Sequence, residues 1–565
     1  MADPLSITGL ALGSASILFQ VFAGVVQGIE LMVDVKEVPE EYANLRLQLQ
    51  LEEGRLLSWG HAFGFVKNNA DDESSVRITI PDPVRYMVQG KLEPLWDRIL
   101  KFTAETPSFT RQPESNQTLG SGGRFKLKLV FSDLRFKGLK LKAQIKWATF
   151  EMGKLKDLVD CARHVNDSLI SLSELKTQRE IYDMVQSTWM GLLDVQDTVG
   201  GLKELIEALS VNNTPGLSHM QTENLLRDLA QLKKRKLQAQ SDADGATSAG
   251  DESSLKLAAK KVVVKGPEES AGLRWEAVVD DKAGYWLEFK PYPRPSDPSR
   301  PTKDELERLV VCELAMLLHL KLPPSFRVPR CIGYYDEGGA FGLVFEKTNQ
   351  KASLVSLSCC LRRKIPQPDL GTRLALARAV AETVYQLHAV DWLHKALRAG
   401  NILLFEETGA SIAYAEPCVS GFDLARPVSQ PNLTQEAYPG GIDDDFYRHP
   451  HNQLCNPSHR KYPYHKDFDL YSLGIVLIEI ALWSPIKTAI GDEGASEPSQ
   501  VKECILNESK EVMSKVRFAM GTGFAKAVLV CLQGLGSQVQ TESYAVSFER
   551  LVLKRIRGVA VMLSE

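Results

Sequence analysis

The chain has 565 residues, which at roughly 150 residues per domain is enough for two large domains or three to four smaller ones. Hydrophobic residues make up 44% and charged residues 24%, which excludes a mainly disordered, fibrous or polytopic membrane protein. The formal net charge of −4 argues against a nucleic-acid-binding protein, so we expect no nucleic acid among its partners. Nine cysteines without a CxxC pair are typical of reduced thiols and predict a cytoplasmic protein.

The first predicted element is an uncharged helix near the N-terminus. No charged residue occurs from Pro4 to Ile29, and Asp3 followed by Pro4 is a favourable helix start. The pairs Gly9/Gly13 and Gly24/Gly28 have the GxxxG spacing that lets two helices approach closely. We expect a helix buried in a soluble bundle at rest. The segment is also long enough to span a bilayer, so a permanent membrane span and insertion on activation are the alternatives.

Two features of the first 150 residues would serve membrane binding. If the first helix inserts, its membrane contacts would be Leu5, Leu12, Leu18, Phe19, Phe22, Val25 and Ile29. Residues 101–150 contain ten basic and three acidic residues, a net charge of +7. Such a segment could hold anionic lipid headgroups at about 1 kcal/mol per basic residue, and the candidates are Lys126, Lys128, Lys137, Lys140 and Lys142. The structural alternative is a solvated basic face paired with the acidic first hundred residues.

Helical periodicity continues through the rest of this half of the chain. Apolar residues recur at helical spacing in residues 39–62 and 145–235, which predicts an α-helical bundle. Small polar residues at 238–254 are typical of a linker. We therefore place the bundle at residues 1–215, a linker that is first helical and then disordered at 216–261, and a second domain at 262–565.

Strand-like runs open the second domain and helical runs follow. The expected strands are Val262–Val264, Trp275–Val279, Tyr285–Lys290, Cys331–Tyr335 and Phe341–Phe345. The expected helices are Glu305–Leu320, Leu370–His388, Leu470–Trp483, Gly523–Gln533 and Ser547–Leu563. A strand-rich lobe followed by a helical lobe resembles the order of elements in protein kinases. The expected fold is thus an N-terminal helical bundle joined to a C-terminal, bilobal α+β domain of the protein-kinase-like class.

Two segments of this domain resemble kinase motifs but lack their acids. The segment around His394 resembles the catalytic loop H-R-D-x-x-x-x-N, with Asn401 at the family spacing and Ala396 at the catalytic aspartate position. Gly421 begins a G-F-D sequence that resembles D-F-G with acid and glycine exchanged, so the metal-binding acid is also missing. A methyl group cannot accept the proton of a substrate hydroxyl, and the second lost carboxylate removes the main metal anchor. The resemblance implies a pseudokinase without ordinary phosphotransfer.

Other residues match the remaining parts of a kinase centre. Lys290 resembles the phosphate-binding lysine of the third strand, with Glu313, or less well Glu307, as its helix partner. Asp469 would be structural and hold the loop around His394. Together with Asn401, Lys290 and Glu313 would be remnants of a nucleotide pocket, which leaves ATP binding without turnover open. No GxGxxG precedes Lys290, and we assign neither a cofactor nor a metal.

An active enzyme remains an alternative to the pseudokinase. An atypical kinase would use Asp423 or a nearby loop acid such as Glu416 to hold the metal. The sequence leans toward no enzymatic activity, because both family carboxylates are missing.

Residues 1–65 and 145–175 resemble the HeLo domain of fungal prion-inhibition and propagation proteins. The matching segments are Leu5–Ile29, Leu45–Leu51, Arg55–Gly60, Ile145–Ala148, Lys154–Val159 and Asn166–Leu169. The resemblance implies a helical bundle that permeabilises membranes through its N-terminal helix, in fungal programmed cell death and heterokaryon incompatibility.

These resemblances predict a signalling protein in which a degenerate kinase domain controls a membrane-active bundle. Its expected partners are further copies of the chain, joined through the helical domain, an anionic membrane and an unknown upstream protein. The chain would be cytoplasmic and recruited to a membrane on activation. A non-lytic oligomerising scaffold is the remaining alternative.

Overall fold

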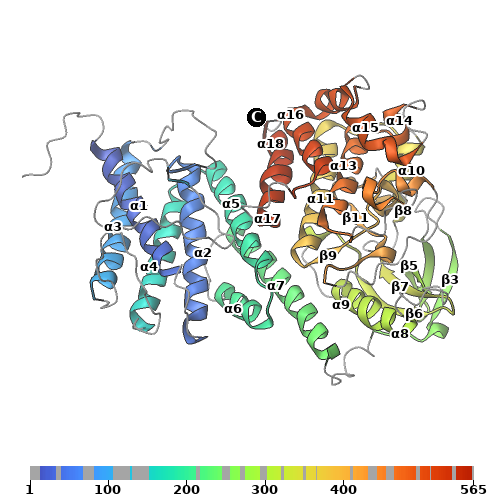
Figure 1. Cartoon of the computed structure of the whole chain (residues 1–565), viewed down its shortest axis with the longest axis horizontal. Helices are drawn as coiled ribbons and strands as arrows, with labels where there is room; N and C mark the ends of the chain where they lie inside the picture. The colour runs from blue at the N-terminus through green and yellow to red at the C-terminus, as the bar shows by residue number, and fades with distance from the viewer. Residues whose placement is uncertain are drawn as a thin grey trace, which may run out of the picture. The chain divides into compact units, whose positions relative to one another are not determined.

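The computed structural model divides into two compact units, Met1–Gln231 and Leu232–Glu565. The boundary lies inside the predicted linker 216–261, within helix α7 (Leu217–Asp244). Figure 1 shows the elements of each unit. The structure describes residues 13–33, 40–67, 80, 82–105, 128–129, 152–210, 217–244, 255–267, 274–292, 302–319, 324–347, 352–363, 365–406, 412–429, 442–453, 463–491, 497–508, 511–536 and 543–562.

The first unit is built from helices, as the periodicity predicts. They are α1 (Gly13–Val33), α2 (Glu40–Ala62), α3 (Asp82–Glu105), α4 (Met152–Ser171), α5 (Leu175–Asp194), α6 (Val199–Ser210) and the first part of α7. Two short strands, β1 (Val66–Lys67) and β2 (Lys128–Leu129), pair antiparallel. Helix α2 packs against α1, α4, α5 and α6 and forms the centre of the bundle (Figure 1).

Helix α1 lies against α3 at two glycines. A Cβ atom on Gly24 would come within 2.6 Å of the ring of Trp96, and one on Gly28 would overlap Ile99. Only glycine permits this approach, since core atoms cannot overlap. The Gly24/Gly28 spacing thus does serve a close helix contact, here within the bundle. On its other side, the ring of Phe22 lies 5.0 Å from that of Phe65.

The residues predicted to meet a membrane have two different positions. The apolar side chains of α1 lie in the bundle core, at 4% exposure or less; they are Leu18, Phe19, Phe22, Val25 and Ile29. They do not face the surface in this structure, because burial between α2 and α3 removes their apolar area from water. The other predicted contacts lie outside the described residues or side chains; they are Leu5, Leu12, Lys126, Lys128, Lys137, Lys140 and Lys142.

A buried network of charges joins α2 to α4. Arg55, 1% exposed, forms an ion pair with Glu52 at 3.0 Å and a second with Asp167. Glu52 also accepts a hydrogen bond from the Asn166 amide at 2.9 Å and lies 3.5 Å from the guanidinium of Arg163. These carboxylates hold the pKa of Arg55 above its usual value despite burial. The core of the bundle therefore includes paired charges as well as apolar packing.

The second unit begins with an antiparallel sheet of five strands in the order β3-β4-β5-β7-β6. The strands are β3 (Val262–Pro267), β4 (Trp275–Val279), β5 (Lys282–Pro291), β6 (Cys331–Asp336) and β7 (Ala340–Glu346). All five lie where the sequence predicts strands. A helical segment formed by α8 (Lys303–Leu306), a π-helical stretch (Glu307–Cys312) and α9 (Glu313–His319) packs against β6.

The remainder of the unit is mainly helical. It comprises β8 (Ser353–Ser356), α10 (Leu357–Arg362), α11 (Leu370–Ala389), β9 (Trp392–Leu393), β10 (Ile402–Glu406), β11 (Cys418–Val419), β12 (Arg426–Pro427), α12 (Ile442–Asp445), α13 (Lys466–Leu482), α14 (Ile486–Ile490), α15 (Val501–Leu506), α16 (Val512–Gln533), α17 (Tyr544–Phe548) and α18 (Lys554–Met562). Helix α13 is almost wholly buried and packs against α11 and α16 (Figure 1). A helical region followed by a sheet-plus-helix region confirms the predicted multidomain fold class.

Helix α16 is, among the described helices, the one long and apolar enough to cross a membrane. Gly521 interrupts it with φ 83° and ψ 165°, which no α-helix adopts. The helix also packs against α13 within the second unit. Its apolar character is therefore explained by its place in the core.

Candidate functional site

The kinase-like residues of the second unit meet between the sheet and the helical region. The His394 ring nitrogen Nε2 lies 3.1 Å from the carbonyl oxygen of Ser420, which directly precedes Gly421. Lys290 of β5 reaches the backbone of the G-F-D turn, where its Nζ donates to the carbonyl oxygen of Asp423. Asn401 lies against Gly421. The fold thus brings together residues that are more than a hundred positions apart in the sequence.

Asp469, at the start of α13, holds the loop that contains His394. Its carboxylate accepts hydrogen bonds from the backbone N–H of His394 at 2.7 Å and of Lys395 at 2.8 Å. The Tyr464 hydroxyl donates to the same carboxylate at 2.7 Å. The nearby His388, together with His394 and the Tyr464 hydroxyl, keeps the pKa of Asp469 below its usual value although it is fully buried. Asp469 therefore occupies the structural position that the resemblance implies.

Both polar atoms of the Asn401 side-chain amide form hydrogen bonds with other residues of the chain. Its Nδ2 donates to the carbonyl oxygen of Ala396 at 2.6 Å, and its Oδ1 accepts a hydrogen bond from Arg274 at 3.0 Å. In active kinases the corresponding asparagine oxygen binds a metal ion. Here that oxygen faces the guanidinium of Arg274, a cation supplied by the chain itself.

Arg274 and Glu288 form a buried ion pair at the centre of the site. Arg274 precedes β4 and Glu288 lies on β5, and their side chains are 4% and 5% exposed. The Arg274 Nε is 3.1 Å from Glu288 Oε1, while its terminal nitrogens donate to the Gly400 carbonyl at 2.9 Å and to Ser420 Oγ. Glu288 accepts the backbone N–H of Gly421 at 2.9 Å. We call this pair, with its bonds to Gly400, Ser420 and Gly421, the interlobe clasp.

The predicted pairing of Lys290 with Glu313 is wrong for this structure. Lys290 donates to the carbonyl oxygens of Asp423 and, at 3.4 Å, of Ala425; within the part of the chain that the structure describes it forms no ion pair with Glu313. The turn after Gly421 brings these carbonyls onto the amine, and Glu313 lies in α9 where its charge acts on Lys236. Burial lowers the pKa of Lys290 to about 8, so the amine is still mostly charged at neutral pH.

An ATP–metal complex does not fit this arrangement. The Asn401 oxygen already binds Arg274, and Gly421 offers no carboxylate to a metal. Glu288 replaces the alanine of the family's V-A-I-K motif and places a buried negative charge two residues before Lys290, where it would repel phosphates. The expected remnants of a nucleotide pocket are therefore bound to residues of the chain.

The two acids considered as replacement metal ligands do not form a metal centre here. Glu416 is exposed, and burial raises the pKa of the Asp423 carboxyl, which favours its neutral form. Among the described residues no three histidine, cysteine or acidic side chains are grouped as metal ligands. The geometry thus gives no support to the atypical-kinase alternative.

Restoring the family's acids should not restore catalysis. We expect the double variant Ala396→Asp/Gly421→Asp to transfer no phosphate, because the interlobe clasp remains. Gly421 has φ 86°, and a Cβ there would overlap the amide of Asn401. We expect the Gly421→Asp change alone to lower the free energy of unfolding by about 2–4 kcal/mol, from backbone strain and overpacking. Transfer of phosphate from labelled ATP measures catalysis, and thermal unfolding measures the loss of stability. The Ala396→Asp variant alone is the control. Phosphotransfer by the double variant that Lys290→Ala abolishes would contradict this expectation.

Arg274 and Glu288 were not singled out from the sequence, although a signal for each was present. Glu288 is a charged residue inside the otherwise apolar run Tyr285–Phe289, and a buried acid requires a partner. Arg274 lies where a glycine-rich loop would end, in a stretch with a single glycine. Nothing in the sequence pairs the two, because they come from different strands.

Comparisons with known proteins identify the first region and give a partial match to a kinase-related protein. Residues 9–205 match the family model described as HeLo, prion-inhibition and propagation. The chain therefore carries a HeLo domain over these residues, which confirms that resemblance. A second match, 27% identical over 150 residues, is to the kinase suppressor of Ras A of Caenorhabditis elegans. It covers 26% of this chain and 19% of that relative, so the chain spans about a fifth of the relative's length.

Proposed function

We propose that this chain, which carries a HeLo domain followed by a kinase-like region, is a cell-death-type signalling protein. The degenerate kinase-like domain would control the helical bundle without phosphotransfer. On activation the bundle would oligomerise with other copies and bind an anionic membrane, with α1 as the inserting helix. The chain would thereby move from the cytoplasm to a membrane in response to an upstream protein.

The observation that carries this proposal is the attachment of α7 to Asp391. Lys233 of α7 and Lys466 of α13 both pair with the Asp391 carboxylate, at 3.2 Å and 3.0 Å. Lys236, one turn further along α7, donates to the carbonyl oxygens of Asp391 at 3.0 Å and of Val390 at 3.4 Å. All of these residues belong to the second unit, which begins at Leu232, so the contacts hold the part of α7 that opens this unit.

Asp391 is well placed to pass on a change in the degenerate centre. It lies directly before β9, which leads into the loop of His394, and its backbone has a left-handed φ of 56°. Its carbonyl oxygen also accepts the N–H of Val428, just after β12. A shift of the His394 loop or of the segment around β12 would therefore alter the position of Asp391, and with it the hold on α7.

The two lysines of α7 that bind Asp391 are buried, so their contacts contribute more to stability than surface ion pairs do. Lys233 is 1% and Lys236 8% exposed, and burial lowers the pKa of Lys236 to about 8. The Asp391 carboxylate is 25% exposed, so its removal should cost less than the roughly 3–5 kcal/mol of a fully buried pair. Loss of this carboxylate should therefore loosen residues 232–238 of α7 and increase their exchange with solvent.

Asp391→Asn in the full chain tests the proposal. We expect faster amide hydrogen exchange in residues 232–238, and leakage of vesicles that contain anionic lipids at protein concentrations where the unaltered chain causes none. Asp280→Asn is the matched control, because Asp280 pairs with Lys261 on the surface at 3.2 Å and such exposed pairs contribute little. Release of α7 with neither leakage nor lipid binding would reject the membrane-effector function. In that case a Leu18→Arg variant that loses oligomerisation would favour the scaffold.

A further inference from the structure

The first half of α16 is attached to the core by one face and presents the opposite face to solvent. Val512, Val516 and Met520 recur every four residues and are at most 1% exposed. Successive residues of an α-helix are turned by about 100°, so Phe518, two positions after Val516, points away from the buried side. Phe518 is 95% exposed, the highest value among the large apolar side chains that the structure describes. The helix thus holds an aromatic ring outside the folded unit.

The charged side chains beside Phe518 are cations without partners. Lys515 and Arg517 are exposed and lie on either side of the ring on the outer arc of the helix. Neither side chain forms an ion pair or a hydrogen bond with any described residue. Helix α16 contains no acidic residue, and Glu511 directly precedes it. Phe518 is therefore surrounded by positive charge on its own helix.

More cations lie on α18 and on the second half of α16. Arg555 donates to the carbonyl oxygen of Lys526 at 3.3 Å, where the two helices pack together (Figure 1). Lys526 and Lys554 are exposed, and no described acid pairs with either. The acid between α17 and α18, Glu549, binds Arg557 at 2.5 Å. We call the exposed ring and the cations without an acidic partner the C-terminal basic patch; its residues are Lys515, Arg517, Phe518, Lys526, Lys554 and Arg555.

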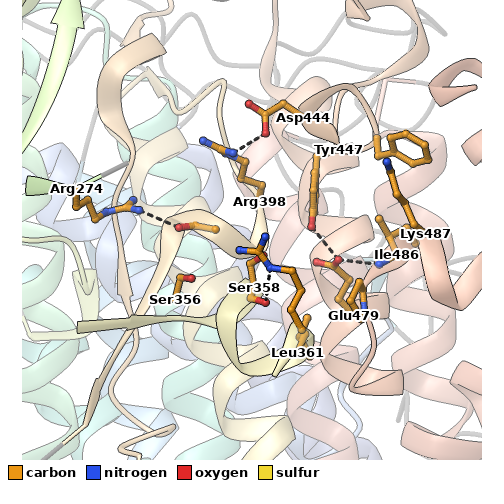
Figure 2. A pocket seen from close by; sticks show the side chains of 14 residues that line it. Arg274, Ser356, Ser358, Leu361, Arg398, Asp444, Tyr447, Glu479, Ile486 and Lys487 are labelled. Atoms are coloured by element: carbon orange, nitrogen blue, oxygen red, sulfur yellow. Dashed lines mark hydrogen bonds and ion pairs between the residues drawn. The ribbon is translucent and has the colours of Figure 1, made fainter. Parts of the chain in front are cut away.

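The cavity beside the interlobe clasp differs from this patch. It measures 340 Å³, and Arg274 and Arg398 contribute to its wall. Figure 2 shows Arg398 paired with Asp444, and Arg274 is held by Glu288 within the clasp. These charges are neutralised inside the chain, whereas the cations of the C-terminal basic patch meet no acid. The larger unpaired positive charge of this unit therefore lies at the patch.

We propose that the C-terminal basic patch binds the surface of an anionic membrane, with Phe518 entering the headgroup layer. Basic side chains are attracted to such a surface, and a helix that combines lysine or arginine with exposed apolar side chains is typical of elements that lie on a membrane. Phe518 gains free energy by leaving water, and a deformable lipid layer accepts a projecting ring without a preformed pocket. An acidic polypeptide matches the charge but must also supply a pocket for the ring.

The patch gives the kinase-like unit a membrane contact of its own. The inference rests on the proposed function for the membrane as the destination of the chain, and it adds a second attachment to that of the bundle. A single weak attachment is reversible, and stable anchoring takes two. We therefore expect the unaltered chain to bind anionic vesicles reversibly and without leakage, and to bind them more tightly once the bundle is released.

Co-sedimentation of the full chain with vesicles tests the patch. One set of vesicles contains phosphatidylcholine and phosphatidylserine, and the other contains phosphatidylcholine alone. We expect binding to the anionic set only, and weaker binding at high ionic strength, because salt screens surface charges. Phe518→Ser or the double variant Lys515→Glu/Arg517→Glu should weaken binding about tenfold or more. All three side chains are exposed, so these variants should keep the fold.

Two controls match these changes in charge and in apolar character. Lys282→Glu/Arg330→Glu reverses two exposed charges on the sheet, and Leu175→Ser removes an apolar side chain that is 77% exposed in the first unit. Neither control should weaken binding more than about twofold, since both lie outside the patch. If the patch variants bind like the unaltered chain, or if the controls lose as much binding, the patch is not the membrane contact.

The remaining outcomes separate the partner and the two proposals. Binding of the full chain to polyglutamate, with none to anionic vesicles, would assign the patch to an acidic polypeptide and overturn the membrane contact. Leakage is measured separately on Asp391→Asn. Vesicle binding that depends on Phe518, without leakage by Asp391→Asn, supports the patch and counts against the lytic function of the bundle. Leakage by Asp391→Asn, with vesicle binding unchanged by Phe518→Ser, rejects the patch alone.

Discussion

Replacing Arg274 by alanine should lower the free energy of unfolding of the kinase-like unit by about 3–5 kcal/mol. The change leaves the Glu288 side chain, which is 5% exposed, without its cation, and it removes the donors that bind Gly400, Asn401 and Ser420. The free-energy cost of a buried charge without a partner is far larger than the stabilisation that the intact ion pair contributes. Chemical denaturation of the full chain, followed by hydrogen exchange in peptides of residues 274–292, measures the effect.

A charge-free version of the clasp separates the loss of charge pairing from the loss of packing. We expect Arg274→Met/Glu288→Leu to recover most of the stability, because apolar residues of similar size often replace a buried ion pair without cost. Lys261→Ala, which breaks the exposed pair with Asp280, should cost less than about 1 kcal/mol. Neither the unaltered chain nor the double variant should be stabilised by ATP with Mg²⁺. A loss below about 1 kcal/mol in Arg274→Ala, or nucleotide stabilisation of the unaltered chain, would show that the site is not closed by this pair.

Arg55→Ala should have an effect of similar size on the HeLo domain, about 3–5 kcal/mol. It leaves Glu52, fully buried on α2, with the more distant Arg163 at 3.5 Å, and it leaves Asp167 of α4 without Arg55. Because both acids belong to the contact between α2 and α4, we expect that contact to open first. Hydrogen exchange of the full chain, resolved by peptide, should show lost protection in residues 40–62 and 152–171 together.

Two matched variants show whether the charge network is responsible. Arg55→Lys keeps a charge but cannot bind Glu52 and Asp167 at once through a planar guanidinium, so it should recover only part of the loss. Lys203→Ala removes an exposed pair with Glu207 on α6 and should change the exchange pattern little. Equal protection of α2 and α4 in Arg55→Ala and the unaltered chain would mean that apolar packing alone holds these helices together.

Local rules predict the helical bundle and the order of elements in the second unit. Apolar residues at helical spacing mark α2 and α4, and short apolar runs rich in aromatic residues mark β5 and β7. The glycine spacing at Gly24 and Gly28 predicts a close helix contact, and α3 provides it. The predicted helix Gly523–Gln533 matches the part of α16 that follows the kink at Gly521, whereas the helical turns before the kink, from Val512 on, are not predicted.

The missing acids at Ala396 and Gly421 are evident in the sequence, and by themselves they argue against phosphotransfer. The interactions that fill the centre in the absence of these acids depend on the tertiary structure. Arg274, Glu288 and Asn401 meet because three separate segments converge on one buried volume, and a buried charge binds whichever partner the packing brings within reach. For the same reason Lys290 binds backbone carbonyls rather than Glu313. The sequence alone determined which chemistry the centre had lost; the packing of distant segments decided that the chain closes the centre with its own residues.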